Sequence, residues 1–149
     1  MRTYDIYKVK KRYQSFILGR EGLLYDLLKD HAQEQPPLQE VRYLCDEIEE
    51  SAIDQAILSN LGKSFTTVES DDGEYKLSHP VKGSIHISLN PYSLQAYCDG
   101  SRMLDLDLFV ALSGSDDRFF AVMDTHGEWG WLKPVKQENH LGNDRTFLF

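Results

Sequence analysis

Residues 64–98 contain four short segments that have the character of β-strands, and this pattern constrains the fold more than any other feature of the sequence. Aromatic, aliphatic and β-branched side chains recur in these segments, which is typical of strands. The segments are 64–69, 74–78, 83–89 and 93–98. A glycine-containing loop at 70–73 (SDDG) joins the first pair, and a turn at 90–92 (NPY) joins the second. The pattern therefore predicts two hairpins, in which neighbouring strands run antiparallel.

The rest of the chain mixes strand and helix patterns. Strands are predicted over 3–9, 119–124 and 128–135, and helical periodicity covers 13–28 and 38–58. Residues 101–112 fit neither period cleanly, and we favour a helix there. With 149 residues, of which 41% are apolar, the chain suits one hydrophobic core. We expect an α+β fold in a single domain over residues 1–149, with a mostly antiparallel sheet packed against two to three helices.

The net charge of −8 argues against two classes of partner. Nucleic-acid-binding proteins carry a basic footprint and anionic membranes attract basic segments, so we expect no direct nucleic-acid binding and no membrane binding. The sequence has no apolar run of about 18 residues, and residues 1–13 lack the apolar segment of a signal peptide. We therefore expect a cytoplasmic protein in which Cys45 and Cys98 are reduced core thiols.

Charge is distributed unevenly along the chain. Residues 1–20 contain six basic residues and one acidic residue, a net of +5, so the remainder carries −13. This basic segment is either a solvated strand end or a local site for an acidic partner surface, where complementary charge would raise the rate of encounter.

Common catalytic and cofactor-binding motifs are absent from the sequence. His79 and His86 are seven residues apart and would face opposite sides of one regular strand, which argues against a shared metal site. Asp105 and Asp107 form a carboxylate pair only if their segment is a strand. His86 and Cys98 would form a base and a nucleophile if neighbouring strands brought them together, although core packing explains both. We expect no catalytic activity, no metal and no cofactor.

The first helical segment has an unusually wide apolar side. Its apolar residues span an arc of about 140° at 100° per residue, and Arg20 lies in the middle of that arc. Gly19 and Gly22 flank Arg20, and each weakens a helix. One edge of the arc holds Phe16, Leu23 and Leu27, and the other holds Tyr13, Ile17, Leu24 and Leu28. We expect one edge to pack on the sheet while part of the other stays exposed.

Both tryptophans of the chain lie in residues 129–136 (WGWLKPVK). Trp129 and Trp131 are two residues apart, so on a strand they share one face. If that face points inward, both simply belong to the core. As structural anchors they would also hold the last hairpin beside the first helix and present Pro134 rigidly, which reduces the ordering cost of binding.

Several of these segments resemble the SirA family, the sporulation inhibitors of replication. The resemblance rests on Tyr4-x-x-Tyr7, on 16–21 (FILGRE), on 121–124 (AVMD) and on 129–136, in that order along the chain. It implies a small non-enzymatic protein that binds the N-terminal domain of the replication initiator DnaA. Such proteins restrain new rounds of chromosome replication as endospore-forming bacteria commit to sporulation.

The resemblance also implies a binding site formed by the exposed side of the first helix and the proline of the tail. The matching positions are Tyr13, Ile17 and Pro134, and Ile17 stands where an aromatic residue is expected. Phe16 and Arg20 complete the expected partner-binding set.

Two other interpretations stay open. A small ligand-binding or hydrolytic domain would use His79 and His86 with Tyr92 and Tyr97, and a closed cleft lined by these residues would favour it. A homodimer would hide the apolar surface from an outside partner, whereas we expect a monomer. A flat apolar surface at residues 13–17 and at Pro134 would favour the partner-binding protein.

Overall fold

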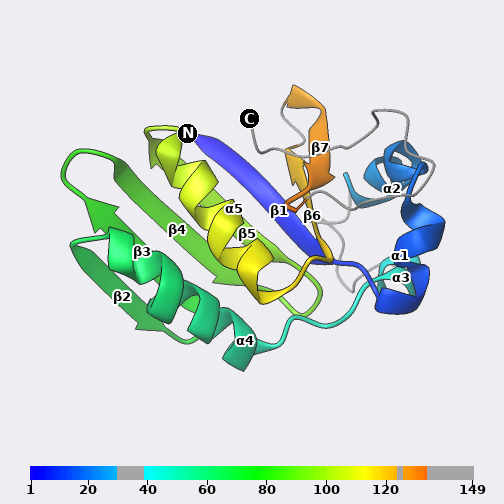
Figure 1. Cartoon of the computed structure of the whole chain (residues 1–149), viewed down its shortest axis with the longest axis horizontal. Coiled ribbons are helices and arrows are strands. Elements are labelled where there is room, and N and C mark those ends of the chain that lie inside the picture. The colour runs from blue at the N-terminus through cyan, green and yellow to red at the C-terminus, as the bar shows by residue number, and fades with distance from the viewer. Residues whose placement is uncertain (30–38, 124–125, 134–149) are drawn as a thin grey trace.

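One antiparallel sheet runs through the molecule in the computed structural model, which describes residues 1–29, 39–123 and 126–133 (Figure 1). Within these residues it has seven strands, in the order β2-β3-β4-β5-β1-β6-β7. Their bounds are β1 Arg2–Lys8, β2 Thr67–Asp71, β3 Glu74–His79, β4 Gly83–Leu89, β5 Leu94–Gly100, β6 Phe119–Met123 and β7 Glu128–Trp131. Every neighbouring pair is antiparallel, so the predicted α+β class is confirmed.

Strand β1 lies in the interior of the sheet although it begins the chain. It pairs with β5 on one side and with β6 on the other, so that Tyr4 lies opposite Ala96 and Tyr7 lies opposite Phe120. At the β2–β3 turn, Asp72 and Gly73 have φ angles of 47° and 78°, the left-handed conformation that two-residue hairpin turns require. The pairing of β1 with β6 and of β6 with β7 brings residues 2–8, 119–123 and 128–131 together at one end of the sheet.

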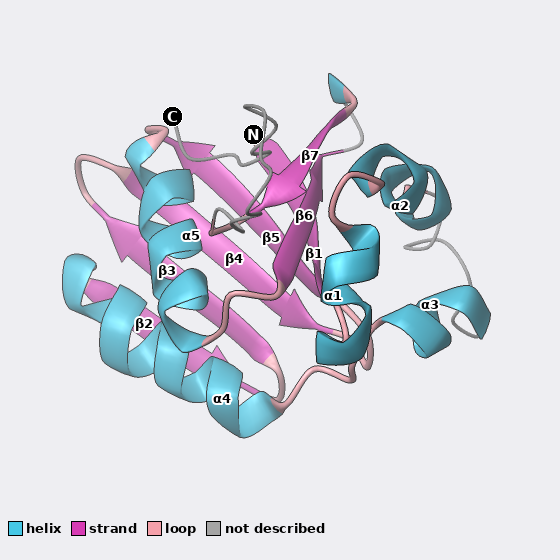
Figure 2. Cartoon of the chain, turned by 45° about the vertical axis from the view of Figure 1, so that its right-hand side comes forward, coloured by secondary structure: helices cyan, strands magenta, loops and turns pink. Residues whose placement is uncertain are grey.

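Alternation of side chains along β1 divides the core between the two faces of the sheet. Tyr4 and Ile6 point to one face, which is covered by α4 and α5. Tyr7 and Val9 point to the opposite face, where α1, α2 and α3 pack near the β1–β6–β7 end (Figure 2). The helices are α1 Lys11–Ile17, α2 Glu21–Leu28, α3 Gln39–Leu44, α4 Glu50–Asp54 with its continuations η2 Gln55–Asn60 and η3 Leu61–Ser64, and α5 Met103–Ser115.

The single helix predicted over 13–28 is two helices, α1 and α2, with a corner at Leu18–Arg20. Gly19 has a φ of +87°, which no regular right-handed helix contains. The amide of Leu18 donates to the carbonyl of Gln14, and the amide of Arg20 donates to that of Ile17, so the end of α1 is closed by its own backbone. The glycine noted as a weak point is where the helix breaks.

The single helix predicted over 38–58 is also wrong. The chain is extended after α3, and Cys45 forms an isolated antiparallel bridge with Val9. The amide of Lys10 donates to Leu44 and the amide of Asp46 donates to Lys8, so backbone hydrogen bonds to the end of β1 replace those of a helix. Helical periodicity continued through 45–49, but pairing with a distant strand overrode it.

Strand β7 ends at Trp131, and residues 134–135 of the predicted strand lie outside the described residues. The helix favoured over 101–112 is present as α5. Within the described part of the chain, none of the helices has both the length and the apolar character that crossing a membrane requires.

Candidate partner-binding surface

The residues assigned to partner binding from the sequence lie in different environments. Phe16 is 56% exposed, Arg20 is exposed, and Tyr13 is half-buried. Ile17 is only 4% exposed and packs in the core under α1 and α2. Pro134 lies outside the described residues.

The expected exposure of Ile17 is therefore wrong, because Ile17 lies on the edge of the apolar arc that packs on the sheet. Ile17, Leu24 and Leu28, which share one edge, all face the sheet, and Phe16 and Leu23, on the other edge, face solvent. Ile17 supports the surface from below and does not offer its side chain to a partner.

Phe16 and Arg20 form a paired contact at the corner between α1 and α2. The guanidinium carbon of Arg20 lies 4.5 Å from the centroid of the Phe16 ring, and Nη1 donates to the Phe16 carbonyl at 2.6 Å. A cation above an aromatic ring is attracted by its π-electrons, and this attraction strengthens when water is removed. An exposed pair of this kind suits an interface that becomes dry on binding.

Tyr43 of α3 extends this surface, and only its position outside the apolar stripe of its segment could have indicated this from the sequence. Its ring stacks on that of Tyr13 with centroids 5.1 Å apart, and the guanidinium of Arg12 lies 5.0 Å from the Tyr13 ring. Interaction with the Tyr43 hydroxyl raises the pKa of Tyr13. Tyr43 is itself 59% exposed and borders a hollow of about 400 Å³ lined also by Gln39, Glu40 and Leu44.

We call Tyr13, Phe16, Arg20 and Tyr43 the α1–α3 surface. Tyr13 and Phe16 are three residues apart on α1 and are therefore neighbours on its side. The exposed cations Lys11, Arg12 and Arg42 belong to the same helices, so basic side chains accompany the aromatic ones. The surface thus combines large apolar groups with positive charge.

Both tryptophans connect β7 with α2. Trp131 is buried, and its ring meets Phe120 edge-on at 5.3 Å between centroids. Trp129 stacks on Tyr25 of α2 at 6.4 Å and on Phe120 at 6.2 Å. These contacts are the geometry that anchoring requires, and the contribution of the two rings to stability stays a prediction.

Glu21, in the first turn of α2, joins the corner to β7. One carboxylate oxygen, Oε1, accepts from the backbone amide of Gly19 at 2.9 Å, and the other, Oε2, accepts from the indole Nε1 of Trp131 at 3.2 Å. Glu21 is only 8% exposed. The sequence segments 16–21 and 129–136, chosen for the resemblance, therefore meet at this carboxylate.

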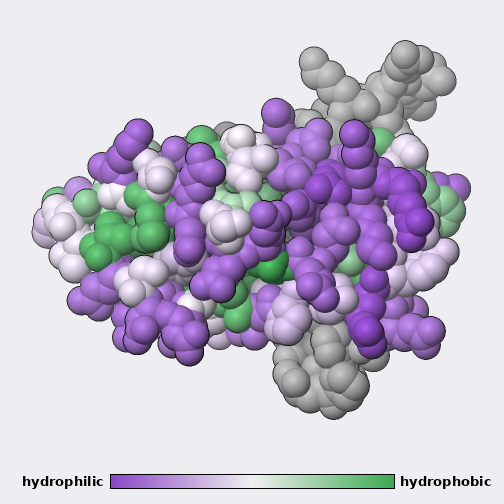
Figure 3. Space-filling view, turned by 90° about the horizontal axis from the view of Figure 1, so that it is seen from below, coloured by the Kyte–Doolittle hydropathy of each residue, from purple (hydrophilic) through white to green (hydrophobic). Residues whose placement is uncertain are grey.

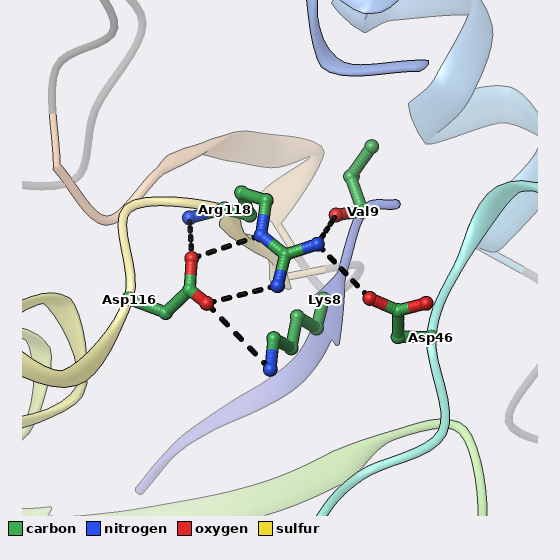
Figure 4. Close-up of polar contacts among 5 residues, drawn as sticks. All are labelled: Lys8, Val9, Asp46, Asp116 and Arg118. Carbon is green, nitrogen blue, oxygen red and sulfur yellow. Dashed lines mark hydrogen bonds and ion pairs between the residues drawn. The ribbon is translucent and has the colours of Figure 1, made fainter. Parts of the chain in front are cut away.

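A network centred on Arg118 holds the start of the extended segment after α3 against β1 (Figure 4). Arg118 donates to Asp116 through Nε and Nη2 and to Asp46 through Nη1, at 3.0, 2.9 and 2.9 Å. Lys8 adds an ion pair with Asp116 at 3.6 Å. Burial alone would raise the pKa of Asp116, but the hydrogen bonds and charge of Arg118 outweigh it, and the pKa is lowered. This network fixes where α3, and hence Tyr43, lies.

The residues of the ligand-binding interpretation do not form one site. His86, on β4, lies opposite Tyr97, and both border an open hollow of about 500 Å³ together with Glu74, at 3.2 Å from His86. His79 is not among the lining residues and bonds through Nδ1 to the amides of the β3–β4 turn. Tyr92 packs beneath α1–α3. A closed cleft lined by the four residues is therefore not seen in the described chain.

The other chemical pairings are separated in the same way. Cys98 points into the core while His86 points to the open face, so the two cannot act as nucleophile and base. Burial raises the pKa of both thiols, that of Cys45 to about 12, which keeps them protonated. Asp105 is buried against Arg2, whereas Asp107 pairs with Lys82. No group of three or more possible metal ligands occurs among residues 1–29, 39–123 and 126–133.

Exposed apolar side chains are not confined to the α1–α3 surface. Viewed from below, the molecule is mainly hydrophilic, with a hydrophobic area toward the end that carries β2 and β3 (Figure 3). Leu58 of η2 and Val68 of β2 are 41% and 37% exposed. The α1–α3 surface differs in that the rings of Tyr13 and Phe16 lie against arginine side chains.

Comparison with known proteins identifies the family of this chain. The family described as "Sporulation inhibitor of replication protein SirA" matches residues 2–136. The protein of that name from Bacillus subtilis (strain 168) is 23% identical over 148 residues, which cover 94% of this chain and 99% of the relative. The chain therefore belongs to the SirA family of sporulation inhibitor of replication proteins.

Proposed function

We propose that this protein inhibits the initiation of DNA replication during entry into sporulation by binding the N-terminal domain of DnaA. The proposal rests on the family and on one structural observation, the exposed Phe16–Arg20 pair beside the Tyr13–Tyr43 stack. The inhibitor is non-enzymatic and acts in the cytoplasm as a monomer until it meets its partner. Light scattering of the free protein tests whether it is a monomer.

The α1–α3 surface determines what the partner must offer. Phe16 and Tyr43 are large rings that are more than half exposed, and such rings act as anchors when they enter pockets on a partner. The exposed side chains of Arg12, Arg20 and Arg42, on the same helices and at their corner, add positive charge. The complementary surface is therefore an apolar depression with acidic residues at its rim, which also accelerates the encounter at low salt.

The interface that the α1–α3 surface can form is small, but a small interface is sufficient for specific binding. Regulatory interfaces of about 1,200 Å² or less are specific when a few anchors are well seated. Because each copy occupies one partner and does not turn over, inhibition requires about as many copies of this protein as of the initiator. Pro134 remains part of the proposal as a contact from the tail.

Titration of the isolated N-terminal domain of DnaA with the full chain tests the proposal, with isothermal titration calorimetry as the readout. We expect saturable binding that weakens when Tyr13 or Phe16 is replaced by alanine. Val81→Ala is the matched control, since Val81 is 86% exposed in the β3–β4 turn, away from α1–α3. Absence of heat and of any saturable signal at about 100 μM would contradict the proposal.

A further inference from the structure

Glu21 is unusual among the buried charged residues of the described chain. The other, Asp105, is paired with the guanidinium of Arg2. No cation lies within ion-pair distance of Glu21 among the described residues, and its two hydrogen-bond donors are neutral. Burial of a charge without a counter-charge is costly. If this position only had to fill space in the core, an apolar side chain would be expected there.

The two donors explain why a carboxylate suits this position. The Gly19 amide belongs to the corner between α1 and α2, where the backbone has a positive φ, and the Trp131 indole belongs to the last strand. A carboxylate offers two acceptor oxygens, whereas glutamine offers one acceptor and one donor. Only an acidic side chain of this length therefore satisfies both N–H groups at once.

The contact ties the exposed residues of the proposed interface to the sheet. Arg20 is the residue that precedes α2, and its guanidinium lies over the ring of Phe16 at the end of α1. Trp131 belongs to β7, whose neighbour in the sheet is β6. Movement of the corner relative to β7 would therefore move Phe16 and Arg20 relative to the rest of the domain.

We propose that Glu21 is a positioning residue for partner binding, and that its carboxylate fixes the α1–α2 corner to β7 so that Phe16 and Arg20 are held in one arrangement. This inference rests on the proposed function. Loss of the carboxylate leaves α1 folded but distributes the corner over several arrangements. The apparent affinity then falls in proportion to the fraction that remains competent to bind.

Glu21→Gln and Trp131→Phe, singly and together, test the inference against the matched control Asp105→Asn. Asp105 is also a buried carboxylate, but it lies on the opposite face of the sheet. Affinity for the DnaA N-terminal domain is measured at a temperature where urea unfolding shows each variant to be fully folded. We expect about a tenfold loss of affinity for each single variant and little further loss for the pair. Asp105→Asn is expected to lose stability but to keep wild-type affinity.

Amide hydrogen exchange of the free proteins gives a second readout that does not depend on the partner. We expect the Gly19 and Arg20 amides to exchange faster in Glu21→Gln, while amides of α5 are unchanged. The inference is wrong if Glu21→Gln and Asp105→Asn lose affinity in the same proportion to their loss of stability. It is also wrong if the Gly19 and Arg20 amides exchange as slowly in Glu21→Gln as in the wild type. If the wild type does not bind at all, the proposed function fails, and exchange alone then decides whether Glu21 holds the corner.

Discussion

Replacing Phe16 by alanine separates binding from folding. The side chain is 56% exposed, and an aromatic side chain presents about 200 Å², so roughly 110 Å² remains for a partner to cover. At about 25 cal/mol per Å² this area is worth at most about 2.8 kcal/mol. Ordering of the ring on binding costs about 0.5–1 kcal/mol, which leaves about 2 kcal/mol, or about a thirtyfold loss of affinity.

The same substitution has a small effect on the free protein. The lost contacts of Phe16 with Arg20 are at the surface, and alanine has the higher helix propensity, so the free energy of unfolding should change by less than about 1 kcal/mol. Titration calorimetry with the DnaA N-terminal domain measures the first effect, and urea unfolding measures the second. A Phe16→Ala variant that binds like Val81→Ala would refute the assignment of Phe16 as an anchor.

Three further predictions concern the framework that supports the surface. Asp105→Ala should lower the free energy of unfolding by about 3 kcal/mol in urea, because it leaves the Arg2 guanidinium partly buried without its carboxylate; a change below about 1 kcal/mol would contradict this. The pKa of Asp116 is lowered by Arg118, so the pair stabilises the fold above the unfolded pKa of about 4 and loses that effect as pH falls through the lower folded pKa. The stability difference between wild type and Asp116→Asn should therefore be constant from pH 7 to about pH 4 and shrink below it, and a constant difference down to pH 2 would argue against the pair. Gly19→Ala should lower stability by about 1 kcal/mol in thermal unfolding through its φ of +87° alone, since a Cβ there meets no atom within 4 Å; an unchanged midpoint would show that the corner relaxes.

The strands were predictable because their signals are local. Residues that are close in sequence determine the turn at Asp72-Gly73. They also determine the alternation of buried and exposed residues on β3 and β4. The place of β1 between β5 and β6 was not predictable, because it depends on contacts between residues about 100 positions apart.

The helical side of the molecule was predicted less well, for reasons that particular residues show. The sequence indicates that Gly19 weakens the helix, but it does not show that the helix breaks there. The break is stabilised by the backbone hydrogen bonds that close α1 and by the hydrogen bond from the Gly19 amide to the Glu21 carboxylate. The arc placed Ile17 on one edge with Leu24 and Leu28, but it did not show that this edge is the one that faces the sheet. Cys45 continues a helical stripe in the sequence and is instead paired with Val9.

Part of the expected partner-binding set is exposed, and its role in binding stays a prediction. Phe16 and Arg20 are exposed, as a contact role requires, whereas Tyr43 was not proposed. Tyr43 reaches the surface because the Arg118 network holds the chain after α3 against β1, and three sequence-distant segments contribute to that network. Periodicity within one helix carries no information about such an arrangement.

The central claim is that the α1–α3 surface is the face that meets the initiator. Hydrogen–deuterium exchange of this protein with and without a saturating amount of the DnaA N-terminal domain tests it most directly. We expect slower exchange in residues 12–20 and 39–44, with β3 and β4 unchanged. Slower exchange confined to β3 and β4, on the open face that carries His86, would contradict it.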